Sequence, residues 1–228
     1  MSTATNVEAT AVNTIGWLSA SETTIVVPVY QRQYRWDIGG CEQLLGDIRS
    51  VSASDDAHTH FIGSILSTAS TSTDDDAQLV LIDGQQRITT LMLLVAALHH
   101  TLRDDDPGLA RELEAVLVRA DDPSRTKLRP HRAWADVFES VVLDRRGPED
   151  EQRASRFDDN YAFFRSQIRP GEAATLWRGL QKLEHVSITL GAQANAQQIF
   201  ESLNSTGEPL RDHELIHNYV LMGLTHTE

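Results

Sequence analysis

The sequence contains little of several residue types, and each shortage excludes a class of protein. One cysteine, Cys41, occurs among 228 residues, which excludes an internal disulfide framework and favours the reducing cytoplasm. The longest apolar run, residues 91–98, is too short to span a bilayer, and the first 14 residues lack the basic and apolar parts of a secretory signal. No phosphate-binding loop of the form G-x-x-x-x-G-K-[ST] occurs, which excludes a P-loop enzyme.

Positive charge is also scarce. The chain has 20 basic and 33 acidic residues, giving a net charge of −13, and this balance argues against a general nucleic-acid coat protein because phosphates would be repelled. One stretch, residues 123–135, holds four basic residues and no acid. We expect its Lys127, Arg129 and Arg132 to contact DNA phosphates without reading sequence. The alternative is that this stretch is an internal salt-bridge face.

Hydrophobic periodicity predicts an α+β fold that follows a flexible tail over residues 1–24. The strands are expected over residues 25–29, 60–67, 79–82 and 185–190. The helices are expected over residues 41–51, 85–102, 107–119, 131–143, 155–168, 172–184, 193–203 and 212–224. This pattern divides the chain into a core over 25–103, a helical insertion over 104–184, and a closing strand with helices over 185–228.

The strongest local signal lies at residues 79–91, where an apolar strand runs into Asp-Gly-Gln-Gln-Arg and then into an apolar helix. A turn at Gly84 would aim the free N–H groups and the positive dipole end of the helix at one point, which makes an anion site. Arg87, in the first helical turn, adds donors suited to phosphate. The alternative is a simple tight turn.

The other polar residues of this turn suit phosphate chemistry. Asp83 is suited to hold a divalent cation that bridges phosphates. Gln85 or Gln86 is suited to orient an attacking water molecule. The alternative for Asp83 is a helix N-cap.

A second signal is the aromatic and basic segment of residues 28–36. If this segment is extended, alternate side chains share one face, which suits stacking on bases or gripping a backbone. The alternative is a core strand with an arginine at its edge. The residues on the shared face are Pro28, Tyr30, Arg32, Tyr34 and Trp36.

Two further motifs lie near the end of the sequence. Asn204, Thr206 and Gly207 belong to a polar turn between two helices, and the small donors of this turn can reach a ligand. The alternative is that the turn is a helix C-cap. His213 and His217 match H-E-x-x-H, the zinc-binding pattern of metallopeptidases. No third ligand follows at the metzincin spacing, so zinc proteolysis is the weaker interpretation.

Together these segments resemble the ParB-like N-terminal domain, with its DGQQR signature, of GmrS/GmrD-type modification-dependent restriction enzymes. Within that group the chain most resembles SspE-type proteins, which act in phosphorothioate-based phage defence. The resemblance covers about residues 25–224. The matching pieces lie at residues 27–32, 34–36, 60–64, 82–91, 127–128, 136–139, 199–207, 215–216 and 218–219.

The resemblance implies a ParB/sulfiredoxin-like core with a small mixed sheet and an added helical region. It also implies hydrolysis of a nucleoside triphosphate, GTP or UTP, with Mg²⁺ held by Asp83. A nuclease domain is expected after residue 228, and the whole is expected to act in the cytoplasm, with a homo-oligomer as a further expectation. The implied catalytic residues are Asp83, Gln85, Gln86 and Arg87, and the implied nucleotide-binding residues are Gly84, Arg32, Asn204, Thr206 and Gly207.

The expected partner is double-stranded DNA carrying phosphorothioates. Sulfur is weakly hydrated and loses little on entering an apolar cleft, and residues 28–36 are mostly apolar. A glucosylated base would need more hydrogen-bonding groups than Gln31 and Gln33 supply. A non-hydrolysing DNA-binding module, whose turn holds a DNA phosphate, stays open as the alternative function. The residues expected to bind the modification are Pro28, Tyr30, Gln31, Tyr34, Arg35 and Trp36.

Overall fold

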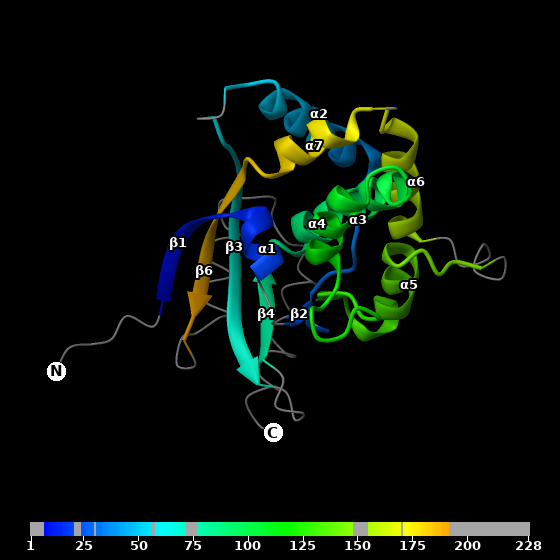
Figure 1. The fold of residues 1–228 in the computed structure, drawn as a ribbon. Coiled ribbons are helices and arrows are strands. Elements are labelled where there is room, and N and C mark those ends of the chain that lie inside the picture. Colours follow the sequence, from blue (N-terminus) through cyan, green and yellow to red (C-terminus); the bar gives the residue numbers. More distant parts are fainter. Residues whose placement is uncertain are drawn as a thin grey trace.

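The computed structural model describes residues 7–20, 24–29, 31–55, 58–71, 77–147, 155–169 and 171–191. In these ranges six strands form one sheet, with seven helices gathered on one side of it (Figure 1). The strands are β1 (Val7–Asn13), β2 (Thr24–Val26), β3 (His60–Thr71), β4 (Ala77–Asp83), β5 (Leu128–Arg129) and β6 (Leu183–Leu190). The helices are α1 (Thr14–Ala20), α2 (Ile38–Ser52), α3 (Gln85–Leu102), α4 (Pro107–Leu117), α5 (Arg132–Val142), α6 (Arg156–Gln167) and α7 (Ala173–Leu180).

The sheet is mixed, in the order β1-β6-β3-β4-β2-β5. β1 pairs antiparallel with β6, and β3 pairs antiparallel with β4. The pairs β3–β6, β2–β4 and β2–β5 are parallel. A mixed sheet with helices is therefore confirmed, while the ParB-like topology stays a prediction. β5 lies inside the region expected to be wholly helical, so that region also contributes a strand to the sheet.

The flexible tail expected over residues 1–24 is wrong from Val7 onward, because this part of the chain forms a strand and a helix. β1 pairs with β6 over seven residues, from Val7 opposite Leu190 to Asn13 opposite Glu184, and α1 follows at once. The expectation failed because β1 is an exposed edge strand in which only Val12 is half-buried. Without a buried face, a strand shows no apolar alternation, and its pairing depends on a distant partner.

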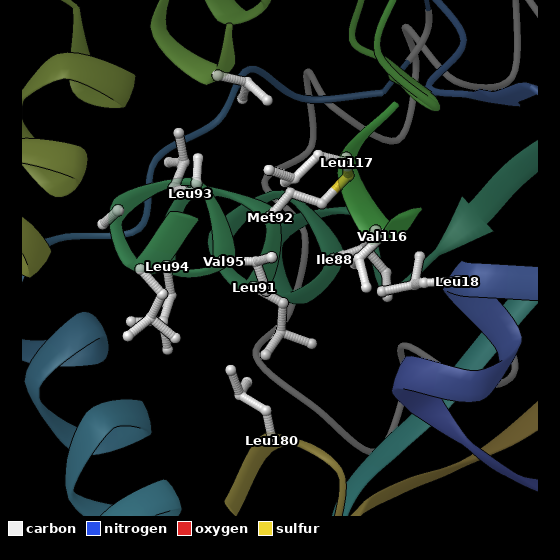
Figure 2. Close-up of a cluster of buried hydrophobic side chains, with 14 of the residues drawn as sticks. Leu18, Ile88, Leu91, Met92, Leu93, Leu94, Val95, Val116, Leu117 and Leu180 are labelled. Carbon is white, nitrogen blue, oxygen red and sulfur yellow. The ribbon is translucent and has the colours of Figure 1, made fainter. Parts of the chain in front are cut away.

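Helix α3 forms the centre of the hydrophobic core, as Figure 2 shows. Every residue from Ile88 to Leu98 is buried, because apolar side chains surround this helix instead of lining one stripe. Leu18 of α1, Val116 of α4 and Leu180 of α7 belong to the same cluster. The packing holds α3 rigidly and thereby fixes the turn at its N-terminus. None of the helices in the described ranges has the length and hydrophobicity to span a membrane.

Lys127 lies in the interior and is 2% exposed. Its ammonium donates to the backbone oxygens of Leu18 at 2.8 Å, Ser19 at 2.9 Å and Ala115 at 2.7 Å. These carbonyls lie at the C-terminal ends of α1 and α4, where helix geometry leaves oxygens without donors. The expectation that Lys127 contacts DNA is therefore wrong, because the residue caps two helices from inside.

The other lysine does the same for a third helix. The Lys182 ammonium donates to the backbone oxygens of Ser54 at 2.9 Å, Asp55 at 3.2 Å and Val51 at 3.4 Å, at the end of α2. A lysine ammonium is a compact charge with three donors, which matches three converging carbonyls better than the flat fork of arginine. Both lysines of the chain thus act as helix caps.

Candidate functional site

The Asp83–Arg87 turn has the strand–turn–helix form that the sequence predicts. β4 ends at Asp83, Gly84 adopts φ 90°, and α3 starts at Gln85. A Cβ at Gly84 would lie 3.0 Å from Cγ1 of Ile65, so both the conformation and the packing favour glycine. The N-cap is Gly84, without a side-chain cap. Asp83 is therefore not the N-cap, which was the alternative for this residue.

The Arg87 guanidinium is fixed by the backbone of β3 and faces Asp83. Nη1 donates to the carbonyl of Ile62 at 2.5 Å and Nη2 to that of Ser64 at 2.7 Å. Nη2 also lies 3.5 Å from Oδ2 of Asp83, and the two side chains are 27% and 33% exposed. Burial lowers the pKa of Arg87, and the Asp83 charge opposes this shift. The turn therefore presents a preoriented cation beside a carboxylate.

Gly63 makes this arrangement possible. The register between β3 and β6 shifts between Phe61 and Ser64, and Gly63 has φ 98° within the shift. A Cβ at this position would stand 2.0 Å from Nη1 of Arg87. The irregularity in β3 thus turns its carbonyls toward the guanidinium, and only glycine leaves room for it.

We expect Gly63→Ala to expel the Arg87 side chain from its two carbonyls. The strained backbone alone should lower the free energy of unfolding by about 1–3 kcal/mol. The measurement is urea denaturation, with Gly46→Ala as the control, because no atom lies within 4 Å of a Cβ at Gly46 in α2. Equal stability of the two variants would show that Gly63 does not hold Arg87 in place.

Gln85 ties the turn to the segment that precedes α2. Its Nε2 donates to the carbonyl of Arg32 at 2.9 Å and to Oε1 of Gln31 at 3.1 Å. Gln31 in turn donates from Nε2 to the carbonyl of Ile82 at 2.5 Å. Hydrogen bonds thus join the aromatic and basic segment to the end of strand β4 and to the first turn of α3.

Gln86 makes the second attachment. The backbone N–H of Arg35 donates to Oε1 of Gln86 at 2.9 Å, and Nε2 of Gln86 donates to the carbonyl of Gln33 at 3.2 Å. Gln85 and Gln86 are only 7% and 8% exposed, as buried amides with partners should be. These bonds give both amides a positioning role, and a catalytic role for either of them stays a prediction.

The segment over residues 28–36 is not a strand with one aromatic face. It turns at Val29, where the N–H of Gln31 donates to the carbonyl of Pro28 at 3.1 Å, and Pro28 has no N–H to extend the ladder. Beyond the turn, Arg32 and Arg35 are exposed, whereas Pro28, Gln31, Tyr34 and Trp36 are half-buried. Tyr30 lies outside the described residues.

Tyr34 packs against the hydrophobic core and is half-buried. Its hydroxyl lies 2.7 Å from Oγ1 of Thr90 and accepts from Nδ2 of Asn160 at 2.7 Å. Its ring stacks on Phe157 at 5.1 Å between centroids, and burial raises the pKa of the Tyr34 phenol. The hydroxyl and the ring of Tyr34 thus both have partners inside the domain, and its contact with modified DNA stays a prediction.

A pocket of about 390 Å³ opens beside Arg87. Its walls come from α2, the start of β3, α3 and the segment before α2. Its α2 and β3 residues were not among the expected site residues, because only the fold brings them together. The lining residues are Trp36, Gly40, Gln43, Leu44, Asp47, His60, Phe61, Ile62, Arg87 and Leu91.

The remaining expected site residues do not join this pocket in the described ranges. Arg129 is half-buried in β5, and its carbonyl accepts from the N–H of Val27 at 2.9 Å. Arg132 is the first residue of α5. Nearby, Nε of Arg125 lies 3.3 Å from Oε2 of Glu139. This ion pair favours the alternative that residues 123–135 form a salt-bridge face. Outside the described residues lie Asn204, Thr206, Gly207, His213 and His217.

Comparison with known protein families identifies the family to which this chain belongs. Residues 15–221 match the model of the GmrSD restriction endonuclease N-terminal domain. The chain belongs to this family. A search of curated proteins found no match. The GmrSD N-terminal domain described here is thus part of a restriction endonuclease, a class of enzyme that acts on DNA in defence against phage.

Proposed function

We propose that this GmrSD N-terminal domain binds a nucleoside triphosphate, GTP or UTP, at the Asp83–Arg87 turn and hydrolyses it. The observation that carries the proposal is the Arg87 guanidinium, which is anchored by Ile62 and Ser64 and lies at the N-terminus of α3 on the wall of a pocket. A fixed cation together with a helix N-terminus stabilises phosphate charge as it develops. Hydrolysis would control a nuclease domain that follows this one.

The residues at the turn fit a magnesium ion that is shared with the substrate. Mg²⁺ usually takes one or two protein carboxylates and completes its shell with phosphate oxygens and water. The described ranges hold no group of three or more side chains of the types His, Cys, Asp and Glu placed to bind a metal. Asp83, which is partly exposed beside Arg87, would serve as the protein ligand, and the ion would neutralise phosphate charge there.

Double-stranded DNA carrying phosphorothioates is the proposed activating partner. Arg32 and Arg35 are exposed, while their backbones are held by the side chains of Gln85 and Gln86. A movement of this segment on DNA would therefore shift the turn directly. Val29 is 49% exposed and offers an apolar surface for sulfur, whereas Tyr34 is half-buried. Glucosylated DNA is the competing mark.

The test is phosphate release from GTP, UTP and ATP with Mg²⁺, measured alone and with plain or phosphorothioate duplexes. We expect release to rise with the modified duplex and to fall at least about 100-fold in Asp83→Asn. Asp104→Asn, which removes an exposed carboxylate beyond the other end of α3, is the control. Duplex binding without any phosphate release would favour the non-hydrolysing module instead.

A further inference from the structure

The pocket beside Arg87 has the volume and the lining chemistry of a site for a flat heterocycle. Part of its lining is apolar, with Leu44 of α2, Leu91 of α3 and Ile62 of β3. Two aromatic residues, Trp36 and Phe61, also line it, and Phe61 is 59% exposed. An exposed phenylalanine in a concave wall offers a stacking surface to a ligand. A pocket of about 390 Å³ is in the range of small-molecule sites.

The same pocket also contains a hydrogen-bond acceptor, the carboxylate of Asp47. Asp47 of α2 and His60 of β3 both line the cavity, with Nε2 of His60 3.6 Å from Oδ2 of Asp47. The Asp47 side chain is 40% exposed and the His60 side chain 34% exposed, so the carboxylate is accessible to a ligand. The separation between the two side chains is longer than a hydrogen bond, so the Asp47 carboxylate keeps its oxygen lone pairs for a ligand that presents donors.

We propose that this pocket holds the base of the nucleotide and that Asp47 selects guanine. The inference rests on the proposed function, because Arg87 is both the phosphate-binding residue and a wall of the pocket. The base would lie between Phe61 and the aliphatic wall, and the phosphates would extend from the pocket toward the turn.

Guanine is favoured over the other bases by its pattern of donors. Its N1–H and N2–H₂ groups are adjacent and can both donate to one carboxylate. Uracil presents a single N–H between two carbonyl oxygens, which a carboxylate repels, and adenine places its amino group beside a ring acceptor. Asp47 therefore decides between GTP and UTP, which the sequence leaves open.

The test compares binding of GTP, UTP, ATP and XTP to the domain by titration calorimetry. We expect Asp47→Asn to weaken GTP binding by about 10- to 100-fold, the value of hydrogen bonds to a charged group. The same variant should improve XTP binding, because the asparagine amide can donate to the extra carbonyl of xanthine. Glu42→Gln removes the same charge from an exposed position of α2 and should change neither affinity.

A second variant tests the stacking surface. Phe61→Ala should weaken all the nucleotides by about 10-fold, and its exposure means that the core stays intact. Wild-type protein that binds GTP, UTP and ATP equally, or an Asp47→Asn variant with unchanged GTP affinity, would overturn the base pocket alone. If the wild-type protein binds no nucleotide, the proposed function fails and the base pocket fails with it.

Discussion

Replacing Arg87 by alanine should lower nucleotide turnover by about 100-fold or more, the usual cost of removing one charge-stabilising donor. The reason is geometric as well as electrostatic, because Ile62 and Ser64 hold the guanidinium in place before any substrate arrives. A preoriented cation pays no reorganisation cost when phosphate charge develops. The measurement is phosphate release at saturating GTP.

Two comparisons keep this result interpretable. Arg87→Lys keeps the charge but loses the fork that spans two carbonyls, so its turnover should also fall, by less than in the alanine variant. Arg111→Ala removes an exposed arginine of α4 and should have wild-type turnover. Thermal melting of each variant separates loss of chemistry from loss of fold. Undiminished turnover in folded Arg87→Ala would remove this residue from the site.

Replacing Lys127 by methionine should strongly destabilise the domain although no salt bridge is broken. The carbonyls of Leu18, Ser19 and Ala115 would lose their buried donor. An unsatisfied buried group costs about 1–3 kcal/mol, so we expect a loss of about 3 kcal/mol or more. At about 2–4 °C per kcal/mol for a chain of this length, the melting midpoint should fall by about 10 °C.

Arg129→Met is the matched control, because it removes a positive charge two residues away without uncapping a helix. Its side chain is half-buried, and its melting midpoint should fall by a few degrees at most. A normal midpoint in Lys127→Met would contradict the capping role. Weakened DNA binding in that variant with unchanged stability would restore the DNA contact that the sequence suggested.

Local signals were enough to predict the turn and its helix. The apolar residues before Asp83, the glycine at 84 and the long apolar run after it are all neighbours in sequence, so the strand–turn–helix follows from short-range rules. The central position of α3 also followed, because a helix that is apolar on every side must be surrounded. Most other strands and helices in the described ranges were placed correctly by periodicity.

Features that depend on distant partners could not be predicted. β1 has no apolar face, and only β6, more than 170 residues later, shows that it is a strand. The bonds of Gln86 to the backbone of Gln33 and Arg35 are visible only in the fold. The same holds for the contacts of Tyr34 with Asn160 and Phe157. A composition rule cannot separate a polar group that binds a ligand from one that binds the protein's own chain.

The use of both lysines as internal caps determines how this domain responds to amine chemistry. Acetyltransferases and amine-directed cross-linkers need a lysine that can reach them as a neutral amine, whereas Lys127 is buried and the ammonium of Lys182 is bound to three carbonyls. All other basic residues, histidine aside, are arginines, whose charge acetylation does not remove. The positive charge of the arginines is therefore permanent with respect to lysine modification, and cross-linking maps of this domain should be built on carboxylate or arginine reagents.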